Sequence, residues 1–226
     1  MTERTVEAPT ACPVILVTGT GSKVGKTIAT AAVAAALTGQ GQRVSAMEPA
    51  YSAPSAPAAG GTVDVAETSE VSRLTGIDAR RFGPASVDEH ATAIADLASS
   101  GCYDAVLVDG TGGLLAWIDA SGGTLADLAT ALQRHDLRTG FVVVADSGPD
   151  ALSHAALTLE VLNARKLDLV GIIGGSAPRS DDLVGHTRLE QLRQAADGRF
   201  LGCLPQHAGQ LPVDNFRASA GDWLLL

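Results

Sequence analysis

Residues 14–27 read VILVTGTGSKVGKT, an apolar run followed by a glycine-rich segment that ends in Gly25-Lys26-Thr27. The β-branched run predicts a buried strand, the glycines predict a tight loop, and the alanine-rich residues from Ile28 onward predict a helix. A strand, a glycine loop and a helix in this order form the cradle that holds the phosphates of a nucleoside triphosphate. These residues therefore predict a nucleotide site.

Each part of this loop has a chemical role. Small residues at positions 19, 21 and 25 let backbone N–H groups approach phosphate oxygens, and the helix N-terminus adds roughly half a positive charge. Lys26 can reach the β- and γ-phosphates, and Thr27 offers a hydroxyl to Mg²⁺. In the general pattern the first glycine would fall at Thr20, whereas here it stands one residue earlier, at Gly19.

Composition and patterning indicate the fold class. The 226-residue chain is 46% hydrophobic and only 4% aromatic, and strand and helix patterns alternate along it. We expect an α/β fold of the P-loop NTPase type: a doubly wound, mostly parallel sheet with helices on both faces. Residues 13–226 are predicted to form this single domain, after a flexible N-terminal tail over residues 1–12.

Charge and cysteine content narrow the function classes. The net charge of −9 disfavours binding to nucleic acid or an anionic membrane, since both need a basic footprint. Cys12, Cys102 and Cys203 lie far apart, which predicts neither a disulfide framework nor a zinc site. The sequence also lacks a membrane-spanning run and a signal-peptide core. It therefore predicts a cytoplasmic protein that acts on small molecules.

Glu48 and two histidines are candidate site residues. Glu48 follows the second predicted strand at the carboxyl edge of the sheet, so it is either a functional residue or a solvated loop residue. His90 is expected to be structural, whereas both roles are open for His154, near the start of its helix. Strands after the first are expected at 43–47, 104–109, 141–145, 169–174 and 199–204, and helices after the first at 64–74, 87–99, 124–132, 151–162 and 183–195.

Three acids follow a low-complexity segment. Residues 50–62 are rich in Ala, Pro, Ser and Gly and predict a mobile loop beside the phosphate site. In the helix after it, Asp64, Glu67 and Glu70 share one face because they are spaced three residues apart. Either this is a solvated face, or Glu67 or Asp64 lies near Mg²⁺.

Asp109 ends the apolar strand 104–109 and is followed by Gly110-Thr-Gly-Gly113. An acid at the end of a strand beside a phosphate loop typically holds Mg²⁺ together with the loop hydroxyl. The alternative is a simple turn at the end of the strand. Gly112 and Gly113 offer backbone N–H groups to an anionic substrate.

Three segments in order resemble the dethiobiotin synthetase family, within the P-loop class that includes ParA/MinD-like proteins. The family loop Gly-Thr-x-Thr-x-Val-Gly-Lys-Thr is similar to residues 19–27, with Ser22 in place of a threonine. The family's Glu-Gly-Ala-Gly-Gly resembles residues 109–113, and its Asn-His-x-x-Leu-Thr helix start resembles residues 153–158. The resemblance covers most of residues 14–205.

This resemblance implies an activity. Family members are homodimeric, ATP-dependent cyclo-ligases that add carbon dioxide to an amine of 7,8-diaminononanoate, phosphorylate the carbamate and close a ureido ring, with Mg²⁺ as cofactor. The residues and the resemblance together predict this site: Gly21, Ser22, Lys23, Val24, Gly25, Lys26, Thr27 and Gly175 for the nucleotide; Thr27, Glu67, Asp64 and Asp109 for the metal; Ser52, Gly112, Gly113 and Ser153 for the substrate; Lys26 and Glu48 for catalysis.

The chain also departs from the family pattern. Glu48-Pro49 stands where the family has Lys-Pro, so an anion replaces a cation expected beside the γ-phosphate. Loss of one such contact typically costs about 10²–10³ in rate. A second family lysine aligns with Gly148, the metal-site aspartate with Glu67, and a base-reading asparagine with Gly175.

These departures leave a second hypothesis open. Glu48 and Gly148 favour a catalytically reduced relative that binds nucleotide in a regulatory role or takes a different ligand. Lys23 is either a replacement for one missing cation or a solvated loop residue. A ParA/MinD-like switch ATPase is disfavoured because the loop lysine of those proteins would fall at Gly21. An ordinary kinase has no support beyond the loop.

Overall fold

The structure, a computed structural model, describes residues 11–49, 66–83 and 85–226, and leaves out the side chains of residues 66–69. Within these ranges seven parallel strands form one sheet in the order β3-β2-β4-β1-β5-β6-β7. The strands are β1 (Val14–Gly19), β2 (Val44–Pro49), β3 (Ala79–Phe82), β4 (Ala105–Gly113), β5 (Thr139–Ala145), β6 (Leu169–Gly174) and β7 (Phe200–Cys203). The helices are α1 (Lys26–Gly39), α2 (Ala66–Thr75), α3 (Val87–Ser99), α4 (Leu125–Gln133), α5 (Ala151–Ala164), α6 (Leu183–Ala195) and α7 (Val213–Trp223), with a short 3₁₀ helix at Ala208–Gln210.

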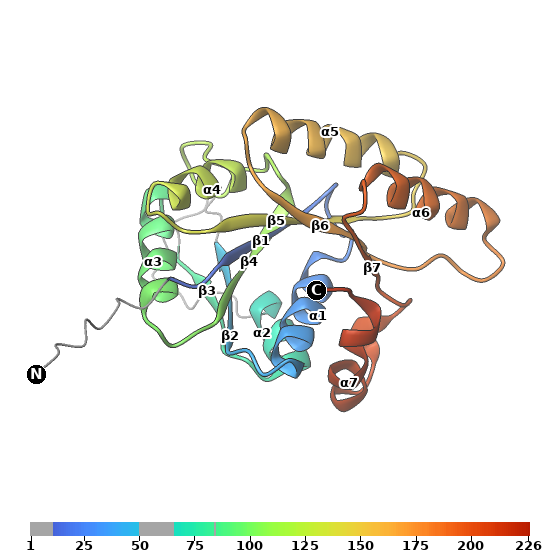
Figure 1. Cartoon of the computed structure of the whole chain (residues 1–226), viewed down its shortest axis with the longest axis horizontal. Coiled ribbons are helices and arrows are strands. Elements are labelled where there is room, and N and C mark those ends of the chain that lie inside the picture. The colour runs from blue at the N-terminus through green and yellow to red at the C-terminus, as the bar shows by residue number, and fades with distance from the viewer. Residues whose placement is uncertain (1–10, 50–65, 84) are drawn as a thin grey trace, which may run out of the picture.

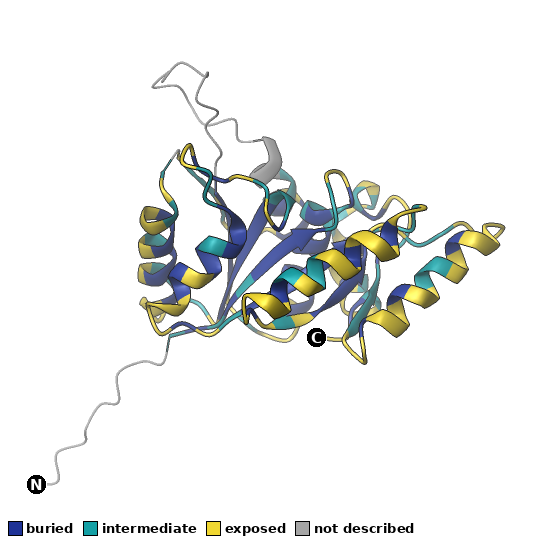
Figure 2. Cartoon of the chain, turned by 90° about the horizontal axis from the view of Figure 1, so that it is seen from above, coloured by how far each residue is buried: buried dark blue, intermediate teal, exposed yellow. Residues whose placement is uncertain are grey.

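Helices cover both faces of the sheet. Figure 1 shows α1, α2 and α7 on one face and α3, α4, α5 and α6 on the other. Alternate strand residues face opposite sides, so Val17 and Val142 pack in the core with α1, while Leu16 and Phe141 pack in the core with α3 and α4. The strands are buried between these layers, and the outer sides of α5 and α6 are exposed (Figure 2). The predicted doubly wound sheet is confirmed.

The strand register brings polar residues to one edge of the sheet. Asp109 of β4 pairs with Val17 of β1, and Met47 of β2 pairs with Val108 of β4. Glu48 and Asp109 each follow this last pair by one residue, so both lie at the carboxyl edge. A parallel sheet presents its ligand groups at this edge.

Helices α3 and α4 each begin with a capping box. Thr124 caps α4, and its hydroxyl accepts a hydrogen bond from the Asp127 N–H at 3.3 Å while the Asp127 carboxylate accepts from the Thr124 N–H at 2.9 Å. Ser86 and Glu89 form the same reciprocal pair at the start of α3. Such boxes satisfy N–H groups that the helix itself leaves without partners.

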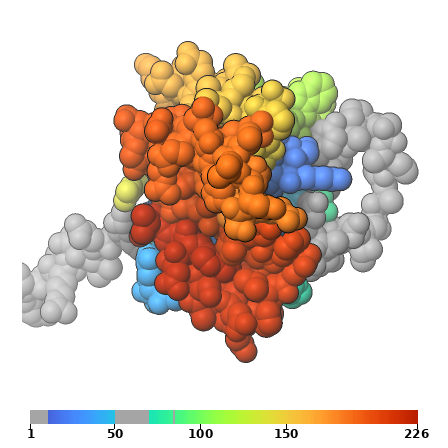
Figure 3. All heavy atoms as spheres, turned by 90° about the vertical axis from the view of Figure 1, so that its right-hand side faces the viewer, coloured from blue at the N-terminus to red at the C-terminus, as the bar shows by residue number. Residues whose placement is uncertain are grey.

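Helix α7 secures the helices next to the nucleotide loop. Phe216 is fully buried against α1, and its ring meets that of Trp223 edge-on at 5.3 Å between centroids. The Arg217 Nε donates to the Leu74 carbonyl oxygen of α2 at 3.2 Å. The C-terminal elements, orange to red, form most of the face shown in Figure 3. Helix α7 thus packs onto α1 and α2.

Two elements were not predicted, β3 and α7. β3 is a four-residue edge strand with arginines at 80 and 81, so it lacks the apolar signal of the other strands. α7 buries only Phe216 and Ala220. β2 also runs on to Pro49 rather than ending at residue 47, and β4 runs on to Gly113 rather than ending at Asp109. Most of the predicted tail and all of the loop 50–62 lie outside the described residues. No helix in the described part of the chain is long and apolar enough to cross a membrane.

Candidate nucleotide site

A cavity of about 430 Å³ lies at the carboxyl edge of the sheet, between the β1–α1 loop and the ends of β2 and β4. The predicted residues that line it come from three separate segments of the chain. They meet because β1 lies beside β4, which lies beside β2. The lining residues are Ser22, Lys23, Gly25, Lys26, Thr27, Ile28, Glu48, Asp109, Gly110, Thr111 and Gly112.

The β1–α1 loop turns sharply through left-handed backbone. Lys23 has φ 60° and Gly25 has φ 98°, a region that glycine enters without steric cost. A Cβ on Gly25 would also lie 2.9 Å from the Gly175 carbonyl oxygen. The loop therefore requires glycine at position 25 for both conformation and space.

Gly175 supports this loop from behind. It directly follows β6, and a Cβ built on it would collide with the Val24 carbonyl oxygen. Val24 itself is buried and packs in the core under α1. Neither residue is among those that line the cavity. Gly175 and Val24 thus fix the shape of the loop from outside the cavity.

Lys26 is the first residue of α1 and is 9% exposed. Its Nζ donates to the Gly21 carbonyl oxygen at 2.8 Å, so the side chain folds back over the loop. The helix behind it begins with the Ala29 N–H donating to the Gly25 carbonyl oxygen at 2.9 Å. The ammonium group therefore lies inside the loop, at the positive end of the helix.

Two acids lie on the other side of the cavity. Glu48 is 2% exposed and Asp109 is 7% exposed. The Glu48 Oε1 lies 3.8 Å from the Arg81 Nη2 of the neighbouring strand β3. The interpretation of Glu48 as a solvated loop residue is therefore wrong, because its carboxylate is buried against the cavity. Strand β2 runs one residue past it, which keeps it inside the sheet.

The donor set fits Mg²⁺. Thr27 and Asp109 line the same cavity and supply a hydroxyl and a carboxylate, the oxygen ligands that Mg²⁺ takes while keeping several waters. Glu67 lies in the first turn of α2, but its side chain is outside the described atoms, and Asp64 is outside the described residues. Among the groups that are described, no cluster of three His, Cys, Asp or Glu side chains could hold a metal ion.

The glycines after Asp109 are required by close packing. A Cβ on Gly110 would lie 2.8 Å from the Val17 carbonyl oxygen, and Gly112 has φ 71°. Gly113 pairs with Gly19 at the end of β1. The backbone after Asp109 therefore stays within reach of the nucleotide loop.

Other predicted residues lie elsewhere. Ser153 and His154 are exposed on the first turn of α5 and do not line the described part of the cavity. Ser52 is outside the described residues. His90 is 1% exposed beside the Phe82 ring, and burial lowers its pKa, as suits a structural residue. Sequence reasoning missed Arg81, whose signal would have been the need of a buried Glu48 for a nearby cation.

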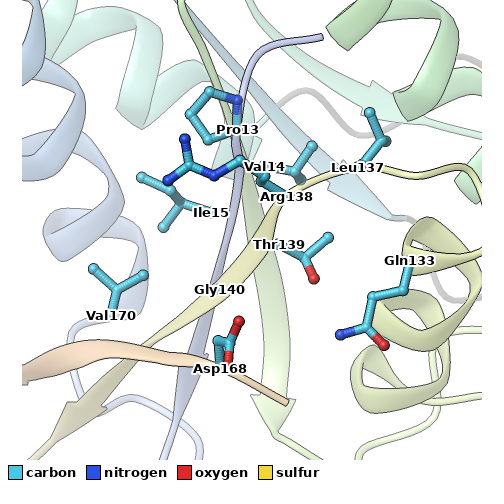
Figure 4. A pocket seen from close by; sticks show the side chains of 10 residues that line it. All are labelled: Pro13, Val14, Ile15, Gln133, Leu137, Arg138, Thr139, Gly140, Asp168 and Val170. Carbon is cyan, nitrogen blue, oxygen red and sulfur yellow. The ribbon is translucent and has the colours of Figure 1, made fainter. Parts of the chain in front are cut away.

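A second hollow, also of about 430 Å³, lies at the opposite edge of the sheet (Figure 4). It is lined by residues at the amino ends of β1, β5 and β6, including Pro13, Val14, Arg138 and Asp168. It has no glycine loop and no helix N-terminus among its lining residues. It therefore lacks the features of a phosphate site.

A parallel sheet whose first strand leads through a glycine loop into a helix, with an acid in the neighbouring strand β4 beside that loop, defines the P-loop NTPase class. The family model described as "AAA domain" matches residues 14–210. A protein of Streptomyces coelicolor named ATP-dependent dethiobiotin synthetase BioD is 38% identical over 94% of this chain and 92% of its own. One of the same name from Frankia casuarinae is 40% identical over 91% and 89%. The chain belongs to the dethiobiotin synthetase family.

Solved structures agree on the fold. The MinD cell division protein of Aquifex aeolicus is similar with a TM-score of 0.58 and 14% identity, covering 93% of this chain and 96% of its own. The cell division protein FtsY of Thermotoga maritima gives a TM-score of 0.61 at 15% identity over 94% of this chain and 69% of its own. At these identities the likeness concerns the fold alone.

Proposed function

We propose that this protein is an ATP-dependent cyclo-ligase of the dethiobiotin synthetase type, which forms a ureido ring from 7,8-diaminononanoate, carbon dioxide and ATP. The observation that carries the proposal is the convergence of Lys26, Thr27 and Asp109 on one cavity beside the glycine loop. Relatives that match nearly the whole chain and bear this enzyme's name support it.

The nucleotide would bind along the β1–α1 loop. Backbone N–H groups from Gly21 to Thr27 and the N-terminus of α1 would hold the phosphates, with Ser22 and Lys23 at the exposed side. Lys26 would leave the Gly21 carbonyl and contact the β- and γ-phosphates. Gly175 would keep the loop in shape rather than read the base.

Thr27 and Asp109 would hold Mg²⁺, with Glu67 or Asp64 as a further ligand. When bound, the ion would neutralise charge that develops during phosphoryl transfer. Two buried acids in one cavity fit a site that takes a divalent cation together with a polyanion.

The chain would promote the reaction mainly by holding the reacting groups in position. An amine nitrogen of the diamine attacks carbon dioxide and loses a proton, which gives a carbamate. A carbamate oxygen then attacks the γ-phosphorus and ADP leaves; the second amine attacks the carbonyl carbon, the ring closes and phosphate leaves. The N–H groups of Gly112 and Gly113, with Ser52 and Ser153, would hold the substrate in line with the loop.

The test measures ADP release with bicarbonate and Mg²⁺-ATP, with and without 7,8-diaminononanoate. We expect release to require the diamine and to be lost in Lys26→Ala. ADP release that never depends on the diamine contradicts the proposal. Detection of the cyclic urea by mass spectrometry identifies the product.

A second candidate is a catalytically reduced relative that binds nucleotide without turnover. The buried carboxylate of Glu48 favours it, since water screens a buried anion little and the anion would oppose a γ-phosphate bound nearby. This candidate predicts calorimetric ATP binding, no diamine-dependent turnover, and a gain of activity in Glu48→Lys.

We also propose that the protein works as a cytoplasmic homodimer. Leu115 and Trp117 are 46% and 57% exposed on the segment after β4, and large apolar side chains on a surface are candidates for an interface. Light scattering coupled to size exclusion should give the mass of two chains, and the mass of one chain would contradict the homodimer.

A further inference from the structure

The charges around the cavity are nearly balanced before any ligand binds. Among the described residues that line it, Lys23 and Lys26 are cationic, and Glu48 and Asp109 are anionic. Glu48 and Asp109 are both buried, so water screens their charges less than it screens an exposed acid. Besides a bound Mg²⁺, a further cation near Glu48 would therefore favour the binding of a polyanionic triphosphate.

Arg81 lies where that cation is needed. Its Cα is the register partner of Glu48 across the parallel pair of β2 and β3, so the two side chains leave the sheet side by side. The Nη2 of Arg81 is 3.8 Å from the Glu48 Oε1, and the Arg81 side chain is 21% exposed. Its neighbour Arg80 instead pairs with Asp78 at 2.6 Å, and both of these side chains are more than half exposed.

We infer that Arg81 is a positioning residue of the nucleotide site: its guanidinium counters the Glu48 carboxylate and so lets a nucleoside triphosphate bind beside a buried acid. The inference rests on the nucleotide binding proposed above. Arg81 acts through Glu48 in this scheme and does not itself contact the ligand.

Repulsion between Glu48 and the phosphates predicts how substitutions at positions 81 and 48 change nucleotide affinity. Without the guanidinium, the Glu48 carboxylate would repel the phosphates at short range in a poorly screened cavity. Removing the carboxylate as well removes the repulsion. The loss caused by changing Arg81 should therefore depend on whether residue 48 is charged, which a double-mutant cycle measures.

The experiment measures calorimetric affinity for a non-hydrolysable ATP analogue with Mg²⁺ in excess. Arg81→Gln should bind at least about tenfold more weakly than the wild type, and the Arg81→Gln, Glu48→Gln double variant should return to within about threefold. Arg80→Gln, on the same strand with an exposed partner, is the matched control and should stay within about twofold. Thermal unfolding of each variant separates loss of binding from loss of fold.

A variant that does not involve Arg81 keeps the inference testable if Arg81→Gln fails to fold. Glu48→Gln alone removes the buried negative charge that the phosphates would meet, so it should bind the analogue about threefold or more tightly than the wild type. Weaker binding by Glu48→Gln overturns the inference. So does wild-type affinity in Arg81→Gln, or a double variant as weak as Arg81→Gln. A wild-type protein that binds no analogue overturns the proposed function first, and this inference with it.

Discussion

The two edges of the sheet carry hollows of about the same volume, 430 Å³, but of different chemistry. At the carboxyl edge the hollow combines a left-handed glycine loop, a helix N-terminus, Lys26 and two buried acids. At the amino edge it is lined by strand starts, with Arg138 and Asp168 both exposed. Size alone does not mark a site; buried charge held by rigid elements does.

This contrast has a structural origin. In a parallel sheet all strands end at the same edge, and the helix that follows a strand presents its N-terminus there. Partial positive charge and free N–H groups thus gather at the carboxyl edge alone. Paired substitutions at the two edges test whether only the carboxyl edge supports nucleotide binding and turnover.

The largest effect is expected from Lys26→Ala. Removing a cation that would contact the transferring phosphate should lower the rate of ADP release by about 10²–10³. Arg138→Ala at the amino edge should leave that rate near the wild-type value. Steady-state kinetics measures both variants, and an equal loss in the two would erase the difference between the edges.

The next largest effect is expected from Gly175→Ala. Its new methyl group would meet the Val24 carbonyl oxygen, which is backbone and has no rotamer to change. We expect a loss of about 1–3 kcal/mol in the free energy of unfolding, together with weaker nucleotide binding.

Gly140→Ala is the matched control for this substitution. Its Cβ would lie 2.7 Å from Val170 Cγ2, a side-chain atom at the other edge that can turn away. Urea denaturation should show the smaller loss here, and calorimetry should show unchanged nucleotide affinity. Normal binding in Gly175→Ala would mean that the loop does not need this support.

Asp119→Asn, after β4, is expected to change stability alone, without the loss of nucleotide binding expected for Gly175→Ala. The Asp119 Oδ1 accepts hydrogen bonds from the N–H groups of Ser121 and Gly123, and Oδ2 accepts from the Val87 N–H. Burial opposes ionisation of Asp119, but these bonds outweigh it and lower its pKa. An amide cannot accept on both sides, so we expect a loss of about 1–3 kcal/mol near neutral pH.

The sign of the pH dependence follows from this lowered pKa. The stabilisation is present above the pKa of an unfolded Asp, about 3.9, and is lost as the pH falls through the lower pKa of the folded state. The difference between wild type and Asp119→Asn should therefore shrink in acid. A difference that grows in acid would contradict it.

Asp104→Asn at the amino edge should have the least effect. Arg43 holds the pKa of Asp104 at about 2 through a hydrogen bond of 2.7 Å, but both side chains are well exposed. Water screens such a pair, so urea denaturation should detect a smaller change than for Asp119→Asn.

The sequence could predict those parts of the fold that local patterns determine. The strand Val14–Gly19 and the helices expected at 87–99 and 124–132 each follow from hydrophobic periodicity. β3 could not be predicted, because it is a strand only through its pairing with β2.

The candidate site likewise contains residues that local motifs could place and residues that they could not. Five loop residues (Ser22, Lys23, Gly25, Lys26 and Thr27) and Asp109 line one cavity because short motifs carry their geometry, and their roles there stay predictions. The burial of Glu48 and its approach to Arg81 depend on the order of strands in the sheet, which no short motif contains. Ser153 was assigned by resemblance, and its exposed position on α5 leaves its role a prediction.

The hydrogen bond from the Lys26 ammonium to the Gly21 carbonyl oxygen competes with any ligand for the Lys26 side chain. A weakly charged molecule gains little by displacing that carbonyl oxygen, whereas a dianionic phosphate gains a stronger, charge-assisted bond. A loop that binds phosphates as proposed would therefore select ligands by their charge, independently of contacts with the base or the substrate.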